Sequence, residues 1–169
     1  MREIIEGYLD YIQKEKRFSR HTVLAYTKDL DQFSKHVQES LQISTIQEVD
    51  HHDVRSWIVI ILEDAHLQAT SVNRKISCLR SLFKYLLRNK LVVKNPMSKI
   101  VSLKTKKKIP LFLEQNQMEN LLDQMEFGTD FNGVRDKLII ELLYCTGMRR
   151  AELIGLKKQN VDRSRQEIK

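Results

Sequence analysis

The side chains best suited to chemistry lie on one face of the segment between residues 70 and 88. If this segment is helical, its geometry collects on one side the residues Arg74, Ser77, Ser81, Lys84 and Arg88. Arginine can donate hydrogen bonds to phosphates or to guanine edges, and small serines let a nucleic-acid backbone approach closely. The pattern therefore favours a helix that lies in a major groove. An exposed basic face with no ligand is the alternative interpretation.

The positive charge of the chain is concentrated around this face. From Ala65 to Leu113 the sequence has twelve Lys or Arg residues and neither Asp nor Glu. The rest of the chain holds the other 17 of the 29 basic residues and all 22 acidic ones, so its net charge is −5. Such segregation is typical of a protein that binds a polyanion. A solvated basic helix followed by a charged linker would show the same count, and so would a helical adaptor that meets an acidic protein.

Composition argues against several other classes of protein. The apolar share of 41% in 169 residues suffices for a packed core. No apolar run approaches the roughly 20 residues needed to span a bilayer, and Met1 leads straight into polar residues without the apolar region of a secretory signal. Cys78 and Cys145 lie far apart among apolar neighbours, outside any metal-ligand spacing. We therefore predict reduced core cysteines, a cytoplasmic location and no membrane partner.

Apolar residues recur at helical spacing through the first half of the chain and predict four helices. The first spans about residues 2–16, and the second starts at a capping Ser19 and runs to about Val37. Asp50 is a plausible cap for the third, which runs to about residue 62 and carries the single Trp57, expected in the core. The fourth begins near Thr70 and carries the basic face.

A break from about Lys90 to Pro110 separates this half from the next. Asn95-Pro96 disfavours helix, and the lysine-rich tract that follows has no helical period. We expect an interdomain linker that carries a phosphate-binding arm. A short helix over 114–124, a loop over 127–132 with nearby glycines, and an apolar helix over 134–144 come next. The sequence thus predicts an all-α chain with a helical domain over 1–95, a basic linker over 96–110, and a second unit over 111–169.

The apolar helix runs into the most specific motif of the chain. It reads Thr146-Gly147-Met148-Arg149-Arg150-Ala151-Glu152-Leu153 and is followed by Asn160-Val161-Asp162. Gly147 would supply the backbone freedom for a sharp turn between helices, and Glu152 lies within reach of Arg149 once a new helix has started. By itself, this spacing is also compatible with a plain helix-turn-helix that carries an ion pair.

In the order and spacing of its motifs the chain resembles the tyrosine recombinases, the family of Xer proteins and phage integrases. Their catalytic domain has a helix that ends in a Thr-Gly turn, then a catalytic arginine, then a Glu-Leu pair that opens the next helix. The stretch from Ser19 to Phe33 is similar to the Ser-x-x-Thr-x-x-x-Tyr-x-x-x-Leu-x-x-Phe signature of the family's core-binding domain. The stretch from Ser71 to Pro96 is similar to the last helix of that domain and its exit. The resemblance implies a four-helix, SAM-like core-binding bundle, a basic linker and the first helices of a truncated catalytic domain.

The resemblance also implies roles for two residues. In this family a tyrosine attacks a DNA phosphate, and negative charge spreads over the equatorial oxygens of the transition state. Arg149 would donate two parallel hydrogen bonds to those oxygens, because a guanidinium is planar and always protonated. Glu152 would be the acid that supports it, and Arg150 matches no required position. The resemblance also implies a reaction without a cofactor, with neither a metal nor a nucleotide.

The chain departs from the family in what it lacks. The family's hairpin lysine, its His-x-x-Arg helix, its further His or Trp and its nucleophilic tyrosine have no counterpart here. The five tyrosines that are present all lie on apolar helical stripes or at their margins, upstream of the arginine motif. We therefore expect this chain to bind DNA without cleaving it.

The expected partners are double-stranded DNA and, in the parent protein, further recombinase protomers that form a tetramer on DNA. The residues predicted to contact the groove or the DNA backbone are His21, Thr22, Thr70, Ser71, Arg74, Ser77, Arg80 and Lys84, followed along the linker by Lys104, Lys106, Lys107 and Lys108. A stand-alone DNA-binding regulator without catalysis remains open beside this reading, as does the helical adaptor.

Overall fold

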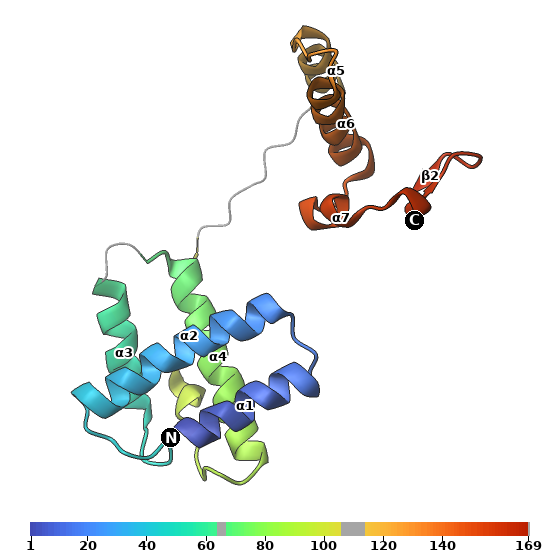
Figure 1. The fold of residues 1–169 in the computed structure, drawn as a ribbon. Helices are drawn as coiled ribbons and strands as arrows, with labels where there is room; N and C mark the ends of the chain where they lie inside the picture. Colours follow the sequence, from blue (N-terminus) through green and yellow to red (C-terminus); the bar gives the residue numbers. More distant parts are fainter. Residues whose placement is uncertain (64–66, 106–113, 169) are drawn as a thin grey trace. The chain divides into compact units, whose positions relative to one another are not determined.

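The computed structural model describes residues 1–63, 67–105 and 114–168, and the chain forms two compact units (Figure 1). The first comprises Met1–Lys107 and the second Lys108–Lys169. Within the described residues, the only strands are two pairs of residues in the second unit, so the predicted all-α class is confirmed. None of the described helices is long and apolar enough to cross a membrane.

Four α-helices build the first unit. They are α1 (Arg2–Lys14), α2 (Arg20–Lys35), α3 (His51–Glu63) and α4 (Ala69–Arg88), and one π-helical turn, η1 (His36–Ser40), continues α2. Both α1 and α2 pack against α4, and α3 packs against it as well (Figure 1). The longest helix, α4, is therefore the element that the other three share, and its apolar side faces all of them.

The starts of α2 and α3 follow the predicted capping chemistry. The Ser19 hydroxyl accepts a hydrogen bond from the Thr22 backbone N–H at 3.2 Å. The Asp50 carboxylate accepts bonds from the backbone N–H groups of His52 at 2.6 Å and Asp53 at 3.1 Å. Each cap satisfies N–H groups that have no partner within the helix. Both predicted helix starts are confirmed.

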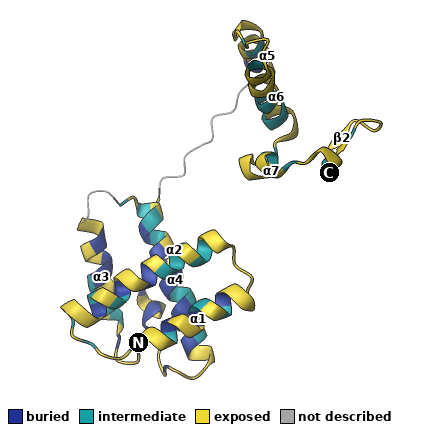
Figure 2. Cartoon of the chain, in the orientation of Figure 1, coloured by how far each residue is buried: buried dark blue, intermediate teal, exposed yellow. Residues whose placement is uncertain are grey.

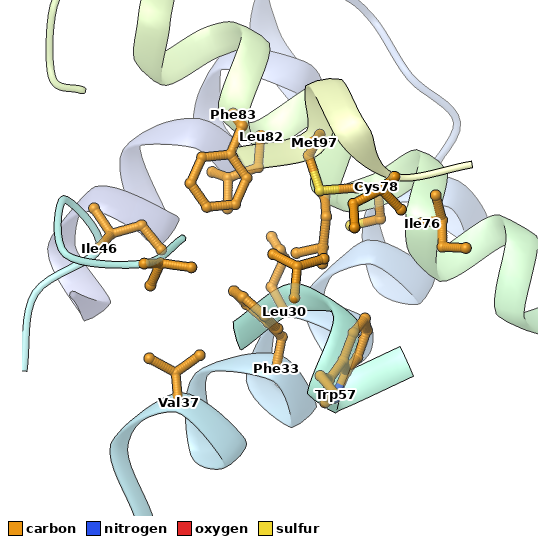
Figure 3. Close-up of a cluster of buried hydrophobic side chains, with 14 of the residues drawn as sticks. Leu30, Phe33, Val37, Ile46, Trp57, Ile76, Cys78, Leu82, Phe83 and Met97 are labelled. Atoms are coloured by element: carbon orange, nitrogen blue, oxygen red, sulfur yellow. The ribbon is translucent and has the colours of Figure 1, made fainter. Parts of the chain in front are cut away.

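The core of the first unit lies where the four helices meet, and buried residues line the inner side of each helix (Figure 2). Trp57 is buried, as predicted, and its ring packs edge-on against Phe33 with 5.1 Å between ring centroids (Figure 3). The polar-looking stretch between η1 and α3 also contributes to the core, since Ile46 is fully buried and Val49 nearly so. Cys78 is buried as expected.

The end of α4 is set by a residue that the sequence did not single out. Lys90 adopts a left-handed backbone with φ of 58°, its N–H donates to the carbonyl of Leu87, and the next N–H, of Leu91, donates to Leu86. This pair of bonds closes the helix in a Schellman motif. The helix therefore ends before the Asn95-Pro96 dipeptide, which instead opens the short 3₁₀ turn η2 (Pro96–Lys99).

The segment that leaves α4 packs back onto the bundle. The turn η2 contacts α3 and α4, and the side chains of Met97 and Ile100 are buried in the same core. The lack of a helical period led us to expect only a linker from residue 96 onward, and the sequence pattern did not predict this packing. Residues 96–103 act as an additional layer of the first unit.

The second unit contains three short-to-medium helices and a small hairpin. Its elements are α5 (Gln115–Gln124), α6 (Phe131–Thr146), α7 (Arg150–Gly155), the 3₁₀ turn η3 (Lys158–Asn160), and the strands β1 (Val161–Asp162) and β2 (Glu167–Ile168). The strands are antiparallel, with Val161 opposite Ile168. Among the described residues of this unit only Met118 is buried.

Two expectations about the second unit are wrong. The loop predicted over 127–132 ends earlier, because the Asp130 carboxylate accepts a bond from the Gly133 backbone N–H at 3.0 Å and starts α6 at Phe131. Cys145 is exposed, although its apolar neighbours predicted a core position. The reason is that α6 has no buried side in this unit: Leu138 and Tyr144 are also exposed.

Candidate nucleic-acid interface

The polar side of α4 presents most of the predicted contact residues to solvent. Thr70, Ser77 and Lys84 are exposed, and so is Arg88 at the last turn. Ser71 is half-buried. The apolar side of the same helix is packed into the core, so the orientation of this polar side is fixed by burial.

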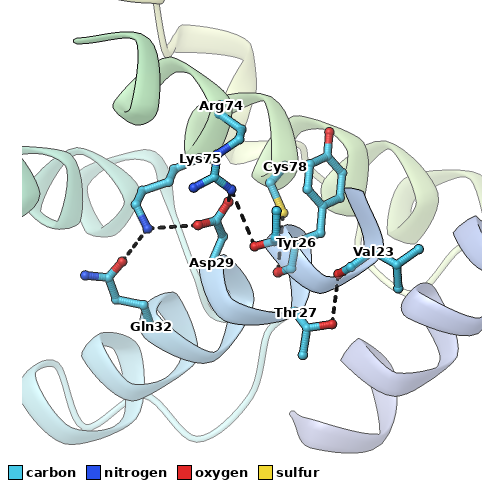
Figure 4. A network of polar contacts seen from close by, with 9 residues as sticks. Val23, Tyr26, Thr27, Asp29, Gln32, Arg74, Lys75 and Cys78 are labelled. Atoms are coloured by element: carbon cyan, nitrogen blue, oxygen red, sulfur yellow. Dashed lines mark hydrogen bonds and ion pairs between the residues drawn. The ribbon is translucent and has the colours of Figure 1, made fainter. Parts of the chain in front are cut away.

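Arg74 lies on this side and is anchored from within (Figure 4). Its guanidinium donates a hydrogen bond to the Asp29 carboxylate on α2, and its side chain remains 43% exposed. A second, longer contact joins the same guanidinium nitrogen to the carbonyl oxygen of Ala25 at 3.4 Å. These contacts leave the other nitrogens of the Arg74 guanidinium available to an incoming acceptor.

The next residue, Lys75, reaches the same carboxylate from a buried position and completes the network. Its ammonium donates to the Asp29 carboxylate at 2.8 Å and to the Gln32 side-chain oxygen at 2.6 Å (Figure 4). Lys75 is only 7% exposed and Asp29 only 2%. One of the twelve cations of the basic stretch therefore serves packing between α2 and α4, which a count of charges along the sequence could not reveal.

Two further polar residues of α4 hold the exit segment in place. The Asn73 side chain accepts a bond from the Leu103 backbone N–H at 2.8 Å and donates to the Leu103 carbonyl at 2.9 Å. The Arg80 guanidinium donates to the Ile100 carbonyl at 2.6 Å and to the Ser102 hydroxyl at 3.0 Å. The chain consequently leaves the first unit beside α4, and the exposed Lys104 follows directly. The predicted contacts Lys106, Lys107 and Lys108 lie outside the described residues.

The beginning of α2 lies close to the second half of α4. His21 is exposed, and the Thr22 hydroxyl lies 2.9 Å from the Ser19 hydroxyl. Just before this helix, Phe18 shares the wall of a surface hollow with Ser81 and Lys84. The structure thus brings predicted contacts from α2 and α4 onto neighbouring parts of one unit.

Two cations that line the same hollow, Lys16 and Arg88, are not among the residues predicted as DNA contacts. Lys16 follows the end of α1, where no helical period relates it to α4. Arg88 does fall on the polar side of α4, so the periodicity already contained the signal for it. No sequence signal placed Lys16 near Arg88.

In the second unit the turn after α6 has the predicted form. Gly147 has a left-handed φ of 65° and caps α6 by donating its N–H to the Leu143 carbonyl at 3.1 Å. The Thr146 hydroxyl donates to the Leu142 carbonyl at 2.5 Å and accepts from the Met148 backbone N–H at 3.2 Å. Glycine adopts this conformation without the steric cost that a side chain would add.

Arg149 and Glu152 meet at the start of α7, as their spacing predicted. The Glu152 carboxylate accepts the Arg149 backbone N–H at 2.8 Å and a guanidinium N–H at 3.0 Å. These hydrogen bonds lower the pKa of the Glu152 carboxyl group below its usual value, and the backbone bond has the larger effect. The Arg149 side chain is 85% exposed. Its guanidinium is therefore oriented by a carboxylate while most of it remains open to a ligand.

One surface group offers the donor types of a metal site. Atoms of Asp50, His51 and His52 lie within 4.8 Å of one another. The Asp50 carboxylate, however, already caps α3, and its backbone hydrogen bonds lower the pKa of this group. Helix capping accounts for this carboxylate without a metal ion.

Comparison with known proteins places both halves of the chain. Residues 5–90 match the family model described as phage integrase, N-terminal SAM-like domain, and residues 111–169 match the model described as phage integrase family. The tyrosine recombinase XerC of Staphylococcus aureus strain JH9 is 38% identical over 163 residues, which cover 96% of this chain and 53% of that protein. XerC of strain MRSA252 is 37% identical over the same span. The chain spans about half the length of these relatives.

Solved structures of similar fold include the Tn1549 transposon integrase in two DNA complexes. The complex with a circular intermediate DNA gives a TM-score of 0.68 at 20% identity, and covers 94% of this chain and 49% of that one. The complex with transposon right end DNA gives a TM-score of 0.67 at 21% identity, with the same coverage. At this level of identity the similarity concerns the fold.

Proposed function

The chain belongs to the phage integrase family of tyrosine recombinases, and on this premise we propose that its first unit binds double-stranded DNA for site-specific strand exchange. The polar side of α4 is the proposed reading surface, with the start of α2 beside it. The second unit contributes the opening part of the catalytic domain. In the full-length protein, protomers of this kind would assemble as a tetramer on DNA.

The observation that carries the proposal is the contrast between the two sides of α4. Its apolar side is fixed in the core, and its other side combines exposed cations with exposed small hydroxyl residues. Lys84 and Arg88 have the charge to bind phosphates, while Ser77 adds no bulk that would keep the helix away from a groove. Arg74 is held at one nitrogen by Asp29, so it would lose less side-chain freedom on binding than an unrestrained arginine.

Arg149 is the proposed transition-state ligand of the full-length enzyme. Its exposed guanidinium would donate hydrogen bonds to the phosphate oxygens on which negative charge develops. Glu152 is the proposed positioning residue, since its carboxylate holds both the backbone N–H and the side chain of Arg149. We expect no cleavage by this chain alone, because the attacking tyrosine of the family has no counterpart in it.

The test is the affinity of the chain for duplex DNA as a function of salt. The variant Ser77→Glu with Lys84→Glu lowers the charge of the proposed surface by three units and leaves the Asp29 network intact. A matched control, Lys35→Glu with Ser44→Glu, makes the same chemical changes at exposed positions at and beyond the far end of α2. We expect wild-type binding to weaken with salt at a log–log slope of about −0.9 per phosphate neutralised.

The two variants separate the candidate functions. DNA binding by this surface requires that the α4 variant loses most of its affinity and that the control keeps it. If wild type does not bind DNA at low salt, the basic surface serves another purpose, such as contact with an acidic protein. If both variants lose affinity equally, net charge and not this surface accounts for binding.

A further inference from the structure

We propose that the hollow between the end of α1 and the second half of α4 holds a single phosphate group of a DNA strand. The hollow has a volume of about 260 Å³, and its polar wall consists of Lys16, Ser81, Lys84 and Arg88 with the phenol groups of two tyrosines. This inference rests on the proposed DNA binding and names the chemical group that this part of the surface would take.

The charges around the hollow favour an anion. Three cations line it, and no carboxylate does. In the part of the chain that the structure describes, none of Lys16, Lys84 and Arg88 forms a salt bridge. Lys84 and Arg88 lie one helical turn apart, where like charges destabilise a helix. A phosphate between them would attract both cations and so offset this repulsion.

An aromatic wall holds two of these cations in place. The Lys16 ammonium lies 5.8 Å from the centre of the Tyr11 ring, and the Arg88 guanidinium donates to the Tyr11 hydroxyl at 3.5 Å. Tyr11 packs against Tyr85 with 4.8 Å between ring centroids, and Tyr85 packs against the fully buried Tyr8 at 5.5 Å. The wall is therefore continuous with the core, and both cations lie against the same Tyr11 side chain.

Helix geometry alone does not explain the cluster. Cations after the end of α1 and in the last turn of α4 complement the helix dipoles, which would account for Lys16 and Arg88. It would not account for Lys84, which lies a full turn earlier, or for the Ser81 hydroxyl group in the same wall. The volume is also below the roughly 300–1,000 Å³ of typical small-molecule sites, so a single anionic group suits it better than a nucleotide.

The experiment measures the salt dependence of DNA binding for Lys16→Gln, Arg88→Gln and the double variant, with Lys35→Gln as the control of equal charge. If one phosphate is shared by these cations, each single variant reduces the magnitude of the log–log slope by about 0.9. The double variant then reduces it little further. The control leaves the slope unchanged. Thermal unfolding of each variant verifies that the bundle is intact.

The outcomes distinguish this site from DNA binding in general. If the single variants keep the wild-type slope while Ser77→Glu with Lys84→Glu abolishes binding, the phosphate site is refuted and the DNA-binding surface stands. Slopes that fall additively in the double variant would mean two separate phosphates and would also refute the shared site. A final titration with inorganic phosphate reports on the source of the ligand: tight binding of free phosphate that DNA does not displace would overturn the assignment to a DNA strand.

Discussion

The guanidinium of Arg74 donates a hydrogen bond to the buried carboxylate of Asp29, which also accepts one from the ammonium of Lys75. One acid on α2 therefore serves two neighbouring cations of α4 that differ in burial. The outer cation belongs to the proposed DNA surface, and the inner one belongs to the core.

Replacing Asp29 with alanine should destabilise the first unit by about 3–5 kcal/mol, because it leaves the Lys75 ammonium buried without its partner. Unfolding in urea, followed by the fluorescence of the single Trp57, measures the change. The double variant Asp29→Leu with Lys75→Met removes both charges and should recover most of the loss. Asp31→Ala, at an exposed position on the same helix, should change the free energy of unfolding by less than about 0.5 kcal/mol. A small effect of Asp29→Ala would contradict the buried pair.

Two lysines of the same region should respond to glycine in opposite ways. Lys90 has a left-handed backbone that glycine adopts without strain, so Lys90→Gly should stabilise the first unit by up to about 1 kcal/mol. Lys84 lies inside α4, where glycine should cost about 1 kcal/mol. The two changes remove the same side chain, so the difference in unfolding free energy isolates the backbone term. Equal effects would refute the Schellman end of α4.

Mild acid should destabilise the first unit through His36. Burial lowers the pKa of this imidazole, an effect that nearby Asp53 partly opposes, and a ring nitrogen lies 3.1 Å from the Ser56 hydroxyl. The folded state therefore binds a proton less readily than the unfolded state, and stability falls as pH drops below the ordinary histidine value of about 6.5. The variant His36→Gln should flatten the stability profile between pH 7.5 and 5.5. An unchanged slope would remove His36 as the cause.

The chain should form no covalent adduct with DNA. A nicked duplex that traps the phosphotyrosine intermediate should yield a protein–DNA band with a full-length tyrosine recombinase and none with this chain. The physical reason lies in the tyrosines: Tyr8 is fully buried, burial raises its pKa, and Tyr11 and Tyr85 pack against it or each other. An adduct that disappears in Tyr144→Phe would identify a nucleophile in the second unit and overturn the prediction.

The parts of the fold that local chemistry determines could be predicted from the sequence. Ser19 and Asp50 cap helices through bonds to residues two or three positions away, and the turn at Gly147 depends on its own backbone. The contact between Arg149 and Glu152 spans three residues and was predicted for the same reason.

Features that depend on distant contacts could not be predicted in this way. The hydrogen bonds between Asn73 and Leu103 join residues 30 positions apart, and neither residue type predicts them. In the sequence, Lys75 cannot be distinguished from its exposed basic neighbours, because its burial depends on the contact with Asp29. Cys145 was misplaced because apolar neighbours predict burial only where another element covers them, and the described residues of the second unit provide no such cover.

The two cysteines differ in exposure, so the rate at which each reacts with a thiol reagent reports on a different unit. Cys145 is exposed, whereas Cys78 is buried against α2 and burial raises the pKa of its thiol. Because the thiolate is the reactive form, a maleimide dye should label the second unit first and selectively. Slower labelling at Cys78 then requires the bundle to open, so its rate follows the local unfolding of α2 from α4. Fluorescent dyes can thus be attached without any substitution, and DNA that binds the folded first unit should slow the second reaction alone.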